Sequence, residues 1–199
     1  MTWVLFRKHL YAPLLVIVFG AALTAVWLAP EERRLIVALI AIVALLAPGF
    51  IGRMLLRDLL ASRALINAGA YEQALGAAQR FLSDLQRRPW IRHAIWTQYG
   101  VYTLSVEAMA SNNGGAALLE LKRFAEARVM LEHARQADPA YPIPIYNLAV
   151  IAKLEGDETE SQLLISEAAA RGFAGGQLDA IVQAVGEAYA RLATPRSNA

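Results

Sequence analysis

Residues 124–139 read FAEARVMLEHARQADP, and this stretch decides the fold. Ala127, Leu131 and Ala134 recur at three- and four-residue spacing, which places them on one face of a helix. The helix is expected to end at Asp138-Pro139, because proline cannot continue it. The stretch therefore predicts a helix that begins near Phe124 and stops before Pro139.

Amphipathic segments separated by breaks continue on both sides of this helix. The sequence contains no convincing two-residue alternation of the kind that predicts a strand. Glycine, asparagine and proline mark the breaks, which fall at Asn67–Gly69, Arg88-Pro89, Asn112–Gly115, Asp138-Pro139, Gly156-Asp157 and Gly172–Gly176. We therefore predict that residues 53–199 form an all-α domain.

The stretch from Phe124 resembles the second helix of the tetratricopeptide repeat, a helix–turn–helix unit of about 34 residues. That helix starts with an aromatic-x-x-Ala pattern, and the first helix carries Trp-x-x-Leu-Gly-x-x-Tyr. Trp96–Gly100, which reads Trp-Thr-Gln-Tyr-Gly, is the clearest first-helix match. It lies farther from Phe124 than one repeat allows, so the register of residues 105–121 stays open.

Two further stretches resemble the same unit. One runs from Pro144 to Phe173 and departs from the pattern at Glu158, where an aromatic is usual, and at Ser161, where alanine is usual. The other is partial: Gly69–Ala74 makes a good turn and second-helix start, but the helix before it matches poorly, for example at Ser62. The resemblance implies an α-solenoid of about three units, with a generic helical bundle as the alternative.

The segment from Gln177 to Leu192 is also amphipathic. Its apolar face holds Leu178, Ile181, Val182, Val185, Tyr189 and Leu192. Because a repeat array needs a terminal unit with one polar side, we predict a C-terminal capping helix here.

The first 52 residues have a different composition. Residues 10–29 and 35–52 contain no charge, and each run is long enough to cross a bilayer as a helix. Pro30–Arg34 lies between them as a polar turn. We predict a transmembrane hairpin rather than a buried soluble helix pair. Cleavage as a signal peptide is disfavoured, because Trp27 would occupy a position that requires a small residue.

Charge near the ends of the hairpin predicts its orientation. Five basic residues lie on the side of the two chain ends and two in the turn; they are Arg7, Lys8, Arg53, Arg57 and Arg63, against Arg33 and Arg34. Lysine and arginine accumulate on the cytoplasmic side. We therefore expect a multi-pass protein of the bacterial inner membrane whose N-terminus and C-terminal domain are cytoplasmic.

Composition and motifs disfavour catalysis and cofactor binding. The chain has no cysteine, and residues 53–199 hold fifteen basic and fifteen acidic residues, so no net basic charge favours nucleic acid. His9, His93 and His133 each lack a metal-ligand partner at helical spacing. We expect no enzyme activity, cofactor, metal, nucleic acid or small-molecule substrate.

The resemblance implies that the domain binds protein in a groove lined by the first helix of each unit. Carried over position by position, the groove residues are Arg63, Asn67, Thr97, Val101, Tyr146, Asn147, Val150 and Lys153. We expect a membrane-tethered adaptor or assembly factor that recruits a partner protein. The alternative is an accessory subunit of a larger membrane complex, held by its transmembrane hairpin.

Overall fold

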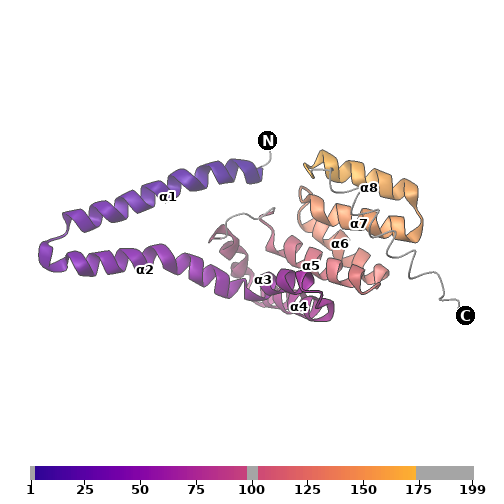
Figure 1. The fold of residues 1–199 in the computed structure, drawn as a ribbon, viewed down its shortest axis with the longest axis horizontal. Helices are drawn as coiled ribbons and strands as arrows, with labels where there is room; N and C mark the ends of the chain where they lie inside the picture. The colour runs from indigo at the N-terminus through magenta and orange to yellow at the C-terminus, as the bar shows by residue number, and fades with distance from the viewer. Residues whose placement is uncertain (1–2, 98–102, 174–199) are drawn as a thin grey trace, which may run out of the picture. The chain divides into compact units, whose positions relative to one another are not determined.

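The computed structural model describes residues 3–97 and 103–173 of the chain (Figure 1). All the regular elements in these residues are helices, which confirms the all-α prediction. The capping helix expected at residues 177–192 lies outside the described residues. Contacts divide the chain into two compact units, Met1–Arg57 with Trp90–Leu104 and Asp58–Pro89 with Ser105–Ala199.

The first unit begins with two long helices that contact each other, α1 (Trp3–Leu28) and α2 (Glu31–Leu55). The break between them is shorter than the predicted turn at Pro30–Arg34, because α2 already includes Glu31–Arg34. Pro30 directly precedes α2, where its fixed φ and missing N–H cost nothing. Glu31 and Glu32 then suit the positive end of the helix dipole.

The side chains of α2 are largely exposed despite being apolar. Leu35, Leu46 and Phe50 have exposed fractions of 72%, 67% and 71%. Among the described residues, α2 alone is long and apolar enough to cross a bilayer, and residues 16–28 of α1 form a shorter apolar segment. A helix in the core of a soluble domain would instead bury such side chains.

The first unit also holds η1, a 3-10 helix at Pro89–Thr97. Its apolar side chains Ile91 and Ile95 are buried, whereas Trp90, Arg92 and His93 are exposed. The prediction that a repeat helix starts at Trp96 is therefore wrong, since this residue lies near the end of η1.

The second unit consists of three helix pairs joined by short turns. Hairpin I is α3 (Arg57–Asn67) with α4 (Tyr71–Arg87), hairpin II is α5 (Val106–Glu120) with α6 (Phe124–Ala137), and hairpin III is α7 (Pro142–Glu155) with α8 (Glu158–Ala170). In sequence order, α4 contacts α5, α5 contacts α6, α6 contacts α7 and α7 contacts α8 (Figure 1). The ends of α3, α4, α6 and α7 agree with the predicted breaks, and α6 begins at the predicted Phe124, whereas the start of α5 at Val106 was not predicted.

The break predicted at Asn112–Gly115 is wrong, because these four residues lie buried inside α5. A Cβ atom on Gly115 would stand 2.6 Å from Leu131 Cγ and 3.3 Å from the Ala127 carbonyl oxygen. The glycine is therefore required for the close approach of α5 and α6, and it does not mark a turn. Ser105 begins α5 as its N-cap and accepts a hydrogen bond from the Ala108 N–H.

The same small-residue pair occurs in each hairpin. Its members lie twelve residues apart, one on the first helix and one on the second, and all are buried: Ser62 with Ala74, Gly115 with Ala127, and Ala149 with Ser161. In hairpin III the two helices are close enough for Ser161 Oγ to donate a hydrogen bond to the Ala149 carbonyl, at 3.0 Å. Gly115 and Ala149 are 34 residues apart, so hairpins II and III share one register.

The three turns share a backbone feature as well. The residue two positions before each second helix has a positive φ: 74° at Gly69, 62° at Lys122 and 86° at Gly156. Glycine adopts this conformation without strain, whereas Lys122 carries a Cβ that disfavours it.

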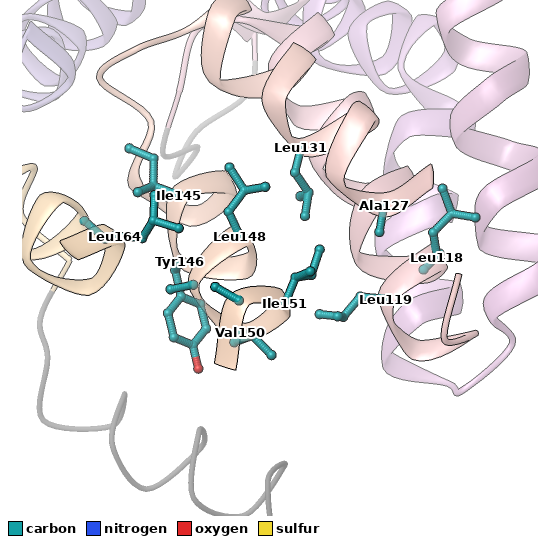
Figure 2. Packing of buried hydrophobic residues seen from close by; sticks show 14 of the residues in the cluster. Leu118, Leu119, Ala127, Leu131, Ile145, Tyr146, Leu148, Val150, Ile151 and Leu164 are labelled. Atoms are coloured by element: carbon teal, nitrogen blue, oxygen red, sulfur yellow. The ribbon is translucent and has the colours of Figure 1, made fainter. Parts of the chain in front are cut away.

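The core of the second unit lies between the stacked hairpins. Figure 2 shows Leu131 of α6 near Leu148 and Ile151 of α7, and all three side chains are fully buried. Leu118 and Leu119 of α5 belong to the same buried cluster. This core supports α3 and α7, the helices that hold six of the eight predicted groove residues.

Candidate partner-binding surface

Hairpin I presents its two predicted groove residues to solvent. Arg63 lies on α3 and Asn67 is the last residue of this helix, and both side chains are exposed. They are available to a binding partner without any rearrangement of the helix.

Of the two residues predicted for the middle hairpin, the structure describes only Thr97, because Val101 lies outside the described residues. Thr97 is the last residue of η1. The first helix of hairpin II is α5, so Thr97 does not belong to it. The aromatic pattern at Trp96 was mistaken for the start of this helix.

Hairpin III holds the remaining four predicted residues, and the domain already uses them. Tyr146 and Val150 are only 8% and 4% exposed. The ring of Tyr146 stacks on Phe173, with centroids 5.1 Å apart. Asn147 Nδ2 donates to Asn112 Oδ1 at 3.0 Å, and Lys153 Nζ lies 3.3 Å from Glu158 Oε1.

The positions of α5 that correspond to the predicted groove residues of α7 were not predicted from the sequence. Moving back 34 residues from Tyr146, Asn147, Val150 and Lys153 reaches Asn112, Asn113, Ala116 and Leu119. The missed signal was the nine-residue distance from Gly115 to Phe124, which equals the distance from Ala149 to Glu158 in hairpin III.

Two asparagines of α5 connect the first helices of all three hairpins. Asn113 Nδ2 donates to Ser62 Oγ of α3 at 2.8 Å, and Asn112 Oδ1 accepts from Asn147 of α7. Asn112 and Asn113 are 5% and 8% exposed. A buried amide without a partner is costly, so these bonds specify how the first helices align.

Charged pairs connect α6 to both helices of hairpin III. Arg128 of α6 lies 2.6 Å from Glu155 Oε2 and 2.9 Å from Glu160 Oε1, across the boundary between hairpins II and III. Hydrogen bonding to Glu160 and then to Glu155 raises the pKa of the Arg128 guanidinium above its ordinary value. One heptad further on, Arg135 pairs with Glu167 at 2.9 Å. The acidic residues near Gly156 thus serve as partners for basic side chains.

His133 has partners that the sequence did not predict. Its Nδ1 lies 3.0 Å from Ser111 Oγ, and its Nε2 lies 3.5 Å from Glu107 Oε1. A serine, a histidine and a carboxylate together suggest nucleophilic catalysis. However, Ser111 has no exposed surface, so a substrate has no access to its oxygen. We interpret the contact as packing between α5 and α6.

The described residues contain no group of three or more histidine and carboxylate side chains arranged to hold a metal ion. Comparison with protein-family models, curated proteins and solved structures found no match to the chain. The fold therefore defines the class directly: an all-helical protein in which an exposed apolar helix precedes a stack of helical hairpins.

Proposed function

We propose that this chain is a membrane-tethered adaptor or assembly factor, in which a tetratricopeptide-like domain recruits a partner protein to the bacterial inner membrane. One observation carries the proposal. A hairpin stack with its own buried core follows two helices whose large apolar side chains are exposed. The exposed helices need a nonaqueous environment, and the stack does not.

The membrane assignment is supported by the position of the exposed side chains along α2. Large apolar residues from Leu35 to Met54 are more than half exposed at ten positions, which are Leu35, Ile36, Leu39, Ile40, Ile42, Val43, Leu46, Phe50, Ile51 and Met54. Contiguous apolar surface of this extent is rare on soluble monomers. Lipid would solvate it, and Arg53 in the last turn would meet the headgroups.

The repeat assignment is supported by the shared 34-residue register of hairpins II and III. Their small-residue pairs allow close crossing, as the tetratricopeptide pattern requires. In hairpin II, Ser111, Gly114, Gly115 and Leu118 occupy the spacing of the Trp-x-x-Leu-Gly-x-x-Tyr pattern. The proposal therefore includes a protein-docking surface on the first helices, with Arg63 and Asn67 as its exposed polar residues.

A second candidate function has an observation of its own. Tyr146, Asn147 and Val150 are occupied by contacts within the domain. If the first helices of hairpins II and III are not free to bind, the main interaction would be made by α1 and α2. The chain would then be an accessory subunit of a larger membrane complex.

Site-specific photocrosslinking in native membranes separates the two functions. The full chain would carry benzoylphenylalanine at Arg63, at Leu39 or at Gln162, which is exposed on α8 and serves as the control. The adaptor predicts a discrete protein adduct at position 63 and none at 39. The accessory subunit predicts the reverse. Equal adducts at positions 63 and 162 would contradict a docking surface on the first helices.

A further inference from the structure

The segment between hairpins I and II is longer than the repeat requires. Eighteen residues, 88–105, separate α4 from α5, whereas four residues, 138–141, separate α6 from α7. The extra residues include η1, which groups with α1 and α2 in the first compact unit. This insertion departs from the repeat register, and it groups with the helices that we propose enter the membrane. It therefore needs a functional explanation.

The composition of this segment fits a membrane surface. Between Asp84 and Glu107 the chain has no acidic residue, and it contains Arg87, Arg88, Arg92, His93 and four aromatic residues. Basic side chains are attracted to the negative potential of anionic lipids. Tryptophan and tyrosine favour the boundary between headgroups and hydrocarbon, because one part of the ring is apolar and the other is polar.

The conformation of η1 separates its apolar and polar residues. Ile91 and Ile95 are each 1% exposed and hold the helix in place. Trp90 is 56% exposed, and Arg92 and His93 are also exposed. The segment thus buries two isoleucine side chains and exposes a large aromatic ring and a neighbouring arginine.

We propose that η1 lies at the cytoplasmic membrane surface and binds anionic lipid headgroups, with Trp90 at the headgroup boundary and Arg92 beside the phosphates. The inference rests on the proposed membrane anchoring and adds a second attachment to the bilayer besides the two long helices. Arg87 and Arg88 stand immediately before η1 in the chain and add to the positive charge of this part of the sequence.

The absence of cysteine makes the inference directly testable by site-directed spin labelling. The full chain would carry His93→Cys, or Gln162→Cys as an exposed control on α8, in nanodiscs of phosphatidylcholine with or without phosphatidylglycerol. With phosphatidylglycerol, the ratio of oxygen to nickel-chelate accessibility at position 93 should rise about twofold or more, because the label enters the headgroup region. The ratio at position 162 should not change.

Charge variants identify the cause of this change. In the His93→Cys background, Arg92→Gln together with Arg87→Gln should abolish the rise, and Arg92→Lys should retain it. An unchanged unfolding midpoint would show that the variants remain folded. The inference is overturned if position 93 behaves like 162 in both lipids, or if its protection is equal with and without phosphatidylglycerol. Failure of the chain to enter nanodiscs would instead overturn the proposed membrane anchoring.

Discussion

At the scale of single residues, Gly115 lies where α5 and α6 approach too closely for a side chain. The Cβ of Gly115→Ala would meet Leu131, whose buried side chain has no space to move, and the Ala127 carbonyl. Overpacking costs about 1–3 kcal/mol, whereas alanine gains roughly 1 kcal/mol over glycine in a helix. We expect a net loss of up to about 2 kcal/mol, measured by chemical unfolding of the full chain in detergent.

Two other glycines provide matched controls for this prediction. At Gly114 the added Cβ would meet the end of the flexible Met130 side chain, so Gly114→Ala should cost less. At Gly76 the nearest atom is Arg80 Nη1 at 3.4 Å, and Gly76→Ala should stabilise α4 by about 0.5–1 kcal/mol. Equal effects at Gly115 and Gly76 would contradict the close crossing of α5 and α6.

Two serines show why the sequence pattern was harder to read than the packing. Ser62 and Ser161 depart from the alanine expected at the crossing positions, and both looked like poor matches. In the structure their size is what matters, because each is buried and hydrogen-bonded, Ser62 with Asn113 and Ser161 with the Ala149 carbonyl. The partner of Ser62 lies 51 residues away, which no local pattern reveals.

At the scale of elements, Arg128 connects α6 to hairpin III through two carboxylates. Arg128→Gln removes both contacts and should lower stability by roughly 1 kcal/mol, with a smaller loss at high salt because the pairs are partly exposed. Chemical unfolding at low and high salt measures both effects. In the control Arg80→Gln, a 64% exposed side chain loses a 3.8 Å contact to Asp58, and the change should stay within about 0.5 kcal/mol.

The turn into α6 carries a pH-dependent pair. Arg123 donates two hydrogen bonds to Glu126, at 2.8 and 2.7 Å, and these lower the pKa of Glu126 below its ordinary value. A lowered acid pKa stabilises the fold above the unfolded-state value, and this stabilisation is lost as the pH falls through the folded-state value. Because both side chains are exposed to solvent, the contribution of the pair should be small.

The pH dependence expected from the lowered pKa of Glu126 can be tested by comparing Glu126→Gln with the unmodified chain. The variant should be slightly less stable at neutral pH, and the difference should shrink as the pH falls below the ordinary glutamate pKa and through the lowered pKa of Glu126. Unfolding midpoints measured across this range test the prediction. A difference that grows on acidification would have the wrong sign and would exclude the pair as its cause.

Helices with strong local signals were predicted well, and those defined by tertiary contacts were not. The composition of α2 was enough to predict a long apolar helix, and the spacing after Phe124 was enough to predict α6. In α5, Asn112–Gly115 has a strong local preference for turns. Helix crossing and bonds to Ser62 and Asn147 override that preference, so the middle hairpin could not be placed from local propensity alone.

At the scale of the whole molecule, membrane retention should depend on α2. Leu39→Arg places a charge near the middle of this helix, where insertion costs about 2.5–3.5 kcal/mol. The variant should be partly extracted from membranes by alkaline washing. Leu60→Arg, which alters a 40% exposed leucine on α3, should be retained like the unmodified chain. Equal retention of both variants would contradict insertion of α2.

The predicted orientation can be tested with single cysteines in intact cells. Glu32 lies in the first turn of α2 and Gln162 lies on α8, and both side chains are exposed. With both chain ends in the cytoplasm, a membrane-impermeant maleimide should label Glu32→Cys from outside and Gln162→Cys only after lysis. Outside labelling of Gln162→Cys would reverse the orientation and would also remove the cytoplasmic setting expected for η1.

The two layers of contacts between hairpins II and III have a mechanical consequence. The hydrogen bond between Asn112 and Asn147 joins α5 to α7, while Arg128 and Arg135 join α6 to hairpin III. A hinge at this junction would have to stretch one layer while it compressed the other, and either motion breaks hydrogen bonds. We therefore expect hairpins II and III to move as one rigid body, so that a displacement of α8 is transmitted to α5.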